Sequence, residues 1–78
     1  MSNQAMSIGM RIRQERLDNA LTQEELAEEA GLATVTISKI ERGEHHPHPT
    51  TIRKIANALD VSPRQLTQGR GGSTRGRV

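Results

Sequence analysis

Residues 21–43 read LTQEELAEEAGLATVTISKIERG, a pattern that predicts two short helices joined by a glycine turn. Thr22 and Glu25 form a capping box, in which each side chain accepts a hydrogen bond from the backbone N–H of the other residue. This box predicts a helix over 23–30, and Gly31 supplies the left-handed residue that ends a helix. The apolar stripe of this helix consists of Leu26, Ala27 and Ala30.

The second helix of the pair, predicted over 34–42, has two chemically different faces. Successive helical residues are about 100° apart, so Ile37 in the core places Ile40, Ala33 and Glu41 within about 60° of it. The opposite face carries Val35, Ser38, Lys39 and Arg42, with Thr34 and Thr36 at the flanks. Two short helices of which the second presents a polar, partly cationic face suit the DNA major groove.

Individual side chains on this outer face match the chemistry of base edges. Val35 is suited to a thymine methyl group, while Thr34 and Lys39 can hydrogen-bond base edges, lysine favouring guanine. Ser38 and Arg42 can contact either bases or phosphates. Two alternatives remain open: Val35 packs against a neighbouring helix, or Ser38 and Arg42 belong to an ordinary solvated face.

Outside this pair, the periodicity predicts three further helices and no strand. A first helix is expected over 7–19, where the apolar residues Ile8, Ile12 and Leu17 fall at helical spacing. A fourth, over 50–59, is expected to turn its aliphatic residues inward: Ile52, Ile55, Ala56 and Leu59. The sequence SPRQ at 62–65 is a strong start signal for a fifth helix that ends near residue 67. The fold class expected is therefore all-α, with one five-helix domain over 7–68.

The two ends of the chain lack a pattern that can build a core. Residues 1–6 are expected to be a disordered N-terminus, and the Arg/Gly-rich segment 69–78 is expected to be disordered as well. Two interpretations of 69–78 stay open, a solubilising end or a flexible arm that contacts DNA phosphates. The segment carries three arginines and no acid, which leaves eight basic against nine acidic residues, a net charge of −1, over 1–68. DNA binding must therefore come from local placement of charge.

Composition excludes several classes of protein. The 78 residues include no aromatic residue and no cysteine. The core must therefore be aliphatic, and the aromatic platforms of single-strand binders are absent. Without cysteine there is no disulfide and no zinc finger, which fits a reducing cytoplasm. We expect no membrane span, because no apolar run approaches about 18 residues, and no signal peptide.

The motifs L-T-Q-E-E-L-A, A-G-L, T-I-S-K-I and E-R-G together resemble the phage-repressor and Xre-type (Cro/C1-type) helix-turn-helix family. The resemblance runs from Ile8 to Leu66, through I-x-x-I-A-x-A-L-x-V in the fourth helix. It implies a compact five-helix lambda-repressor-like domain, with the helix-turn-helix in helices two and three. It also implies binding of palindromic double-stranded DNA operators as a homodimer, without a cofactor. The helix around Leu66 is the expected dimer surface.

The resemblance also assigns roles to individual positions. The base-reading positions are Thr34, Val35 and Lys39, together with Ser38. The phosphate-contacting positions are Gln23, Thr36 and Arg42, with His46 from the following loop. An ion pair is expected between Arg16 and Glu41. Ala33 departs from the family pattern, which has serine or threonine at this helix cap, so Thr34 could cap instead and shift the first turn.

The function expected is that of a sequence-specific transcriptional regulator, a repressor or autoregulator, that reads the major groove with the helix over 34–42. The alternative is an antitoxin-like or coactivator-like module that binds a partner protein, for which the acidic face of the helix over 23–30 is suited. A metal site at His45, His46 and His48 is a weak alternative, because neither cysteine nor a suitably placed acid completes it. An enzyme is not expected, because no nucleophile–base constellation is present.

Overall fold

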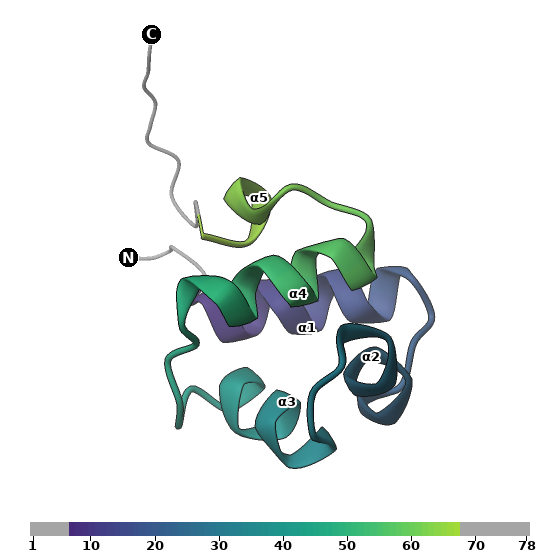
Figure 1. The fold of residues 1–78 in the computed structure, drawn as a ribbon, viewed down its shortest axis with the longest axis horizontal. Coiled ribbons are helices and arrows are strands. Elements are labelled where there is room, and N and C mark those ends of the chain that lie inside the picture. Colours follow the sequence, from purple (N-terminus) through teal and green to yellow (C-terminus); the bar gives the residue numbers. More distant parts are fainter. Residues whose placement is uncertain (1–6, 68–78) are drawn as a thin grey trace, which may run out of the picture.

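The computed structural model describes residues 7–67, which fold into five α-helices (Figure 1). In chain order they are α1 (Ile8–Asp18), α2 (Gln23–Ala30), α3 (Thr34–Glu41), α4 (Pro49–Leu59) and α5 (Pro63–Thr67). No strand occurs in this part of the chain. The expected all-α, five-helix fold is confirmed, whereas the predictions for 1–6 and 69–78 lie outside the described residues.

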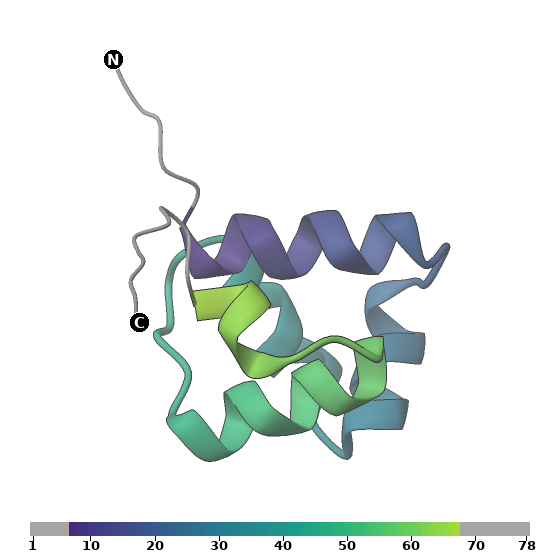
Figure 2. The same ribbon diagram turned by 90° about the horizontal axis from the view of Figure 1, so that it is seen from above.

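The helices are arranged around α1 and α4. Helices α2 and α3 lie together on one side of α1 and α4, and α5 lies on the other side (Figure 1). Seen from above, α5 lies between α1 and α4 and contacts both of them (Figure 2). Helix α3 packs against α1 and α2, so none of the helices within residues 7–67 covers its outer face.

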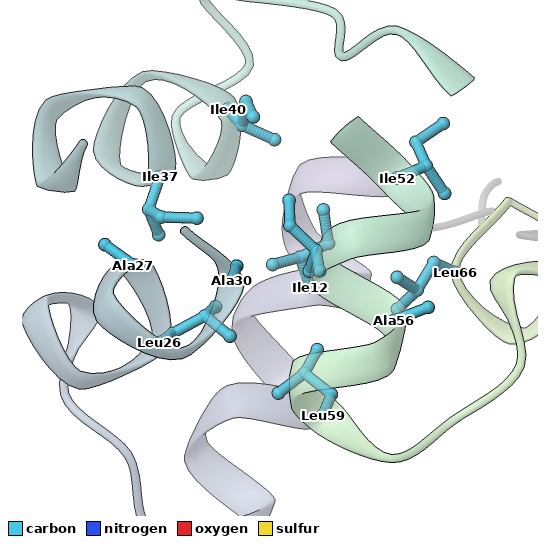
Figure 3. Close-up of a cluster of buried hydrophobic side chains, with 11 residues drawn as sticks. Ile12, Leu26, Ala27, Ala30, Ile37, Ile40, Ile52, Ala56, Leu59 and Leu66 are labelled. Atoms are coloured by element: carbon cyan, nitrogen blue, oxygen red, sulfur yellow. The ribbon is translucent and has the colours of Figure 1, made fainter. Parts of the chain in front are cut away.

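Each helix contributes aliphatic side chains to a single core (Figure 3). Side chains that are at most 8% exposed come from α1 to α5 in turn: Ile12, Leu26, Ala27, Ala30, Ile37, Ile40, Ile52, Ile55, Ala56, Leu59 and Leu66. Burial of a residue such as leucine or isoleucine stabilises the folded state by about 1.5–3 kcal/mol. A core without aromatic rings therefore depends on close packing of small helices.

The local end signals of α2 act as the sequence predicts. The Thr22 Oγ1 accepts from the Glu25 N–H at 3.0 Å, and the Glu25 carboxylate accepts from the Thr22 N–H at 2.8 Å. Gly31 follows the helix with φ 72°, the left-handed conformation that glycine adopts without steric cost. Ala33 is the N-cap of α3 and makes no side-chain cap hydrogen bond. The helix still begins at Thr34, so the first turn is not shifted.

The helical spacing that the sequence assigned to Leu17 does not bring it to the core, because this side chain is 52% exposed. Leu17 is five positions after Ile12, which places the two side chains about 140° apart on a helix. The buried residues of α1 are Gly9, Ile12 and Arg16. The ends of α1, α3 and α4 differ from the predicted ends by one residue, within the ordinary scatter of helix boundaries.

One further expectation about burial is corrected by the tertiary packing, and one about the dimer stays a prediction. The helix around Leu66 remains the expected dimer surface, but the Leu66 side chain itself is fully buried in the domain's own core. Ala33 is exposed, although helical spacing placed it near the buried face of α3. It is the N-cap, where the backbone is extended (φ −75°, ψ 145°), so helical periodicity does not apply to it.

Gly9 lies where α1 meets the C-terminal end of α3. A Cβ atom built on this residue would overlap the Ile40 carbonyl oxygen and lie 3.1 Å from the Glu41 carbonyl oxygen. Both atoms belong to the backbone of α3, which cannot shift without disturbing the helix. The close approach of α1 and α3 therefore requires glycine at this position.

We expect Gly9→Ala to lower the free energy of unfolding by about 1–3 kcal/mol, the usual cost of overpacking. The sign of the change in unfolding free energy is informative, because glycine-to-alanine changes at unobstructed helix positions stabilise by about 0.5–1 kcal/mol. Urea denaturation measures the difference, with the exposed Arg13→Ala in the same helix as a control expected to stay within about 0.5 kcal/mol of the parent. A Gly9→Ala variant as stable as the parent would contradict the close contact.

Candidate DNA-binding surface

The outer face of α3 presents most of the predicted base-reading side chains to solvent. Val35 is 56% exposed, and Thr34 and Lys39 are exposed. Ser38 and Thr36 are half-buried. Val35 therefore does not pack against a neighbouring helix, which removes one of the alternatives left open by the sequence.

Val35 is an exposed β-branched residue in the first turn of α3. Its χ1 freedom is restricted in a helix, and its apolar surface remains in water. The polar side chains of Thr34 and Lys39 flank it on the same side of α3. Methyl groups beside hydroxyl and ammonium groups match the mixture of methyls, donors and acceptors in the major groove.

A buried ion pair joins α1 to the C-terminal end of α3. The Arg16 Nε donates to the Glu41 Oε2 at 2.7 Å, and the Arg16 Nη2 donates to the Glu41 Oε1 at 3.1 Å. The two side chains are 9% and 3% exposed. The remaining Arg16 nitrogen, Nη1, donates to the carbonyl oxygen of Leu21 at 2.8 Å, just before α2. This forked geometry satisfies charges that would be costly to bury unpaired.

Gln23, the first residue of α2, belongs to the same hydrogen-bond network. Its Nε2 donates to the Glu41 Oε1 at 3.0 Å, so this carboxylate oxygen accepts hydrogen bonds from both Gln23 and Arg16. The sequence placed Gln23 at a phosphate and did not predict this contact. The carboxamide retains a second N–H and an oxygen, and the half-buried side chain lies at the N-terminus of α2, where helix geometry favours anions.

Arg42 follows α3 and is hydrogen-bonded within the protein. Its Nε and Nη2 donate to the two carboxylate oxygens of Glu44 at 2.9 and 3.2 Å, and its Nη1 donates to the Ser38 hydroxyl. These hydrogen bonds and the charge of Arg42 lower the pKa of Glu44, and the charge of Lys39 acts in the same direction. The pKa of Arg42 is raised by the same pairing. No role was predicted for Glu44 from the sequence, although an acid two residues after Arg42 indicates an ion pair between the two side chains.

The loop between α3 and α4 carries the three histidines. His45, His46 and His48 are exposed, whereas Pro47 is fully buried and anchors the loop. His46, predicted to contact phosphate, therefore lies on an accessible loop directly beside an anchored residue. Within residues 7–67, no three His, Cys, Asp or Glu side chains group in a way that could hold a metal ion.

The acidic surface that the alternative function requires is present on α2. All four of its glutamates are exposed: Glu24, Glu25, Glu28 and Glu29. Among the helices that the structure describes, none is both long and apolar enough to cross a membrane.

Comparison with known proteins places this geometry among helix-turn-helix proteins. The model of the HTH_3 helix-turn-helix family matches residues 12–66. The control protein C.BamHI of Bacillus amyloliquefaciens is 39% identical over 66 residues, which cover 83% of this chain and 82% of that protein. Other curated relatives are longer: the chain spans 39% of a phage immunity repressor and 46% of a Bacillus subtilis transcriptional regulator.

Solved structures share the fold. The P22 c2 repressor in complex with a synthetic operator has a TM-score of 0.77 and 32% identity, over 83% of this chain and 98% of that one. SinR of Bacillus subtilis, in its complex with SinI, has a TM-score of 0.73 and 40% identity, over 76% of this chain and 58% of that one. The lambda-repressor-like arrangement that the resemblance implied is therefore confirmed.

Replacing one partner of the buried ion pair is expected to destabilise the domain strongly. Glu41→Ala leaves the Arg16 guanidinium charged and without its carboxylate, which costs about 3–5 kcal/mol for a buried pair. Thermal and urea denaturation of the variant measure this loss. Glu29→Ala, which removes an exposed acid from α2, is the matched control and is expected to change stability by less than about 0.5 kcal/mol. An unchanged midpoint for Glu41→Ala would contradict a structural role.

Proposed function

This chain belongs to the HTH_3 helix-turn-helix family of DNA-binding transcriptional regulators, and we propose that it acts as a sequence-specific repressor or autoregulator whose α3 reads the DNA major groove. The family is one of transcriptional regulators and not of enzymes. The observation that carries the proposal is the exposed Val35, flanked by Thr34 and Lys39 on the face of α3 that no other helix covers. Thr34, Val35, Ser38 and Lys39 contact bases in this proposal.

The phosphate contacts proposed here surround this reading surface. Gln23 and the first-turn N–H groups of α2 hold a phosphate on one side. Thr36 contacts the DNA backbone from the first turn of α3, Arg42 from the C-terminal end of this helix, and His46 from the following loop. Phosphate contacts of this kind set the register of the protein on the duplex, whereas base contacts select the sequence. The P22 c2 repressor, which shares the fold, is solved on an operator, and this supports the assignment.

We further propose that two copies bind a palindromic operator, with half-sites about one helical turn apart. The C.BamHI relative is named a control protein, and the match covers most of that protein, which supports a regulatory role for this chain. The dimer surface has to involve residues other than the buried Leu66 side chain.

A second candidate function is recognition of a partner protein. The observation that favours it is the SinR structure, which contains SinI as a second protein. The exposed acidic face of α2 is chemically suited to a basic partner. Both functions use α2 in this scheme: its N-terminal end is assigned to a phosphate, and its exposed glutamates are assigned to the partner.

The decisive experiment is selection of bound duplexes from a random-sequence DNA pool at about 0.1 M salt, a fixed value because salt strongly alters DNA affinity. Enrichment of a palindrome supports a dimer that reads a specific operator. Enrichment of a single half-site supports a monomer instead. Absence of enrichment by folded protein would contradict the first proposal and favour the protein-partner function.

Lys39→Ala is expected to relax base preference at one position of the selected site by about 1–3 kcal/mol, because one hydrogen-bonded contact to a base edge is lost. The measurement is competition binding with duplexes substituted at each position in turn. Lys54→Ala, which removes an exposed cation from α4, controls for the loss of positive charge. If Lys39→Ala keeps every base preference of the parent, Lys39 does not read a base.

A further inference from the structure

The hydrogen-bonded cluster of Ser38, Arg42 and Glu44 lies at the end of the proposed reading helix. Two Arg42 nitrogens donate to the two Glu44 oxygens, and the third donates to Ser38. Two members of the cluster, Ser38 and Arg42, are residues to which the proposed function gives DNA contacts. The third member, Glu44, is an acidic residue on a surface that is proposed to bind DNA, a polyanion.

The pairing of Arg42 with Glu44 contributes little to the fold. The two side chains are 53% and 54% exposed, and only one residue separates them in the chain. Exposed ion pairs of this kind are weak, because water and salt screen them. A role in stability therefore does not account for the presence of the acid at this position.

The same geometry has a direct consequence for phosphate binding. Carboxylate and phosphate both accept two parallel hydrogen bonds from an arginine guanidinium, so they compete for the same donors. While Glu44 holds the Nε and Nη2 of Arg42, the pair has no net charge. The remaining cation on this part of α3 is Lys39, whose charge also acts on Glu44.

Resting on the proposed function, we propose that Glu44 is an intramolecular competitor for the DNA phosphate at Arg42. It restrains the sequence-independent, salt-sensitive part of DNA binding. Glu44 hydrogen-bonds to Arg42 and to none of the four side chains proposed to contact bases, so the preferred sequence is expected to stay the same. Phosphate contact by Arg42 requires the guanidinium to leave Glu44 or to share its N–H groups.

The test compares Glu44→Gln with the parent on a random-sequence duplex between about 0.05 and 0.2 M salt. One additional phosphate neutralised by Arg42 steepens the plot of log affinity against log salt by up to about 0.9, so the affinity ratio of Glu44→Gln to the parent is expected to grow about 3.5-fold as the salt falls from about 0.2 to about 0.05 M. Asp60→Asn is the matched control: it removes one negative charge at the C-cap of α4, where Asn also tolerates the left-handed backbone. Its salt slope is expected to equal that of the parent.

Two further measurements separate competition from a general charge effect. In an Arg42→Ala background, Glu44→Gln is expected to leave the salt slope unchanged, because no guanidinium remains to be released. The sequence selected from a random pool is expected to be the same for Glu44→Gln and the parent. An equal gain without Arg42, or an equal gain in Asp60→Asn, would overturn the proposal.

Weaker binding by Glu44→Gln would also overturn it, because Glu44 would then orient Arg42 for DNA. If the parent protein binds DNA and Glu44→Gln has the same salt slope, the role of Glu44 as a competitor is refuted. The proposed DNA-binding function is not affected by that result. A folded parent that binds no duplex at low salt refutes the proposed function, and this inference falls with it.

Discussion

The contact between Arg16 and Glu41 is the constraint on which the geometry of the proposed reading surface depends. It joins α1 to the end of α3, and through Leu21 and Gln23 it reaches the segment where α2 begins. A buried carboxylate is tolerated only when its oxygens are hydrogen-bonded, and Glu41 accepts three such bonds. The network thus holds the start of α2 in position relative to α3, and these are the two parts of the helix-turn-helix to which DNA contacts are proposed.

The aliphatic core imposes a second constraint, which is close approach of short helices. Without an aromatic ring to span a gap, the helices must be near enough for isoleucine, leucine and alanine side chains to fill the interior. Gly9 permits this approach between α1 and the backbone of α3. Since α3 is held from its inner side by α1 and α2, its outer side remains available, and Val35 stays in water.

The positions of the charged residues matter more for the proposed DNA binding than the net charge of the protein. The net charge over 1–68 is −1, and the two arginines that hydrogen-bond to residues of α3 are both paired with an acid, Arg16 in the interior and Arg42 at the surface. The buried pair is a structural element, whereas the exposed pair is weak enough for a phosphate to compete with it. With one arginine held inside the fold and the other paired at the surface, little positive charge near α3 is unpaired. This agrees with the small net charge over 1–68, which predicts only modest electrostatic attraction for DNA.

Local signals in the sequence were sufficient to predict the five helices, the capping box at Thr22 and the left-handed Gly31, because caps and 3.6-residue periodicity act over a few neighbouring residues. Motifs of the same local kind identified the candidate reading surface on α3. The exposure of Leu17, the burial of Leu66 and the hydrogen-bond partners of Gln23 could not be predicted in this way. Burial and side-chain pairing depend on which residues meet after helices distant in the chain have packed, and that information is absent from any single segment.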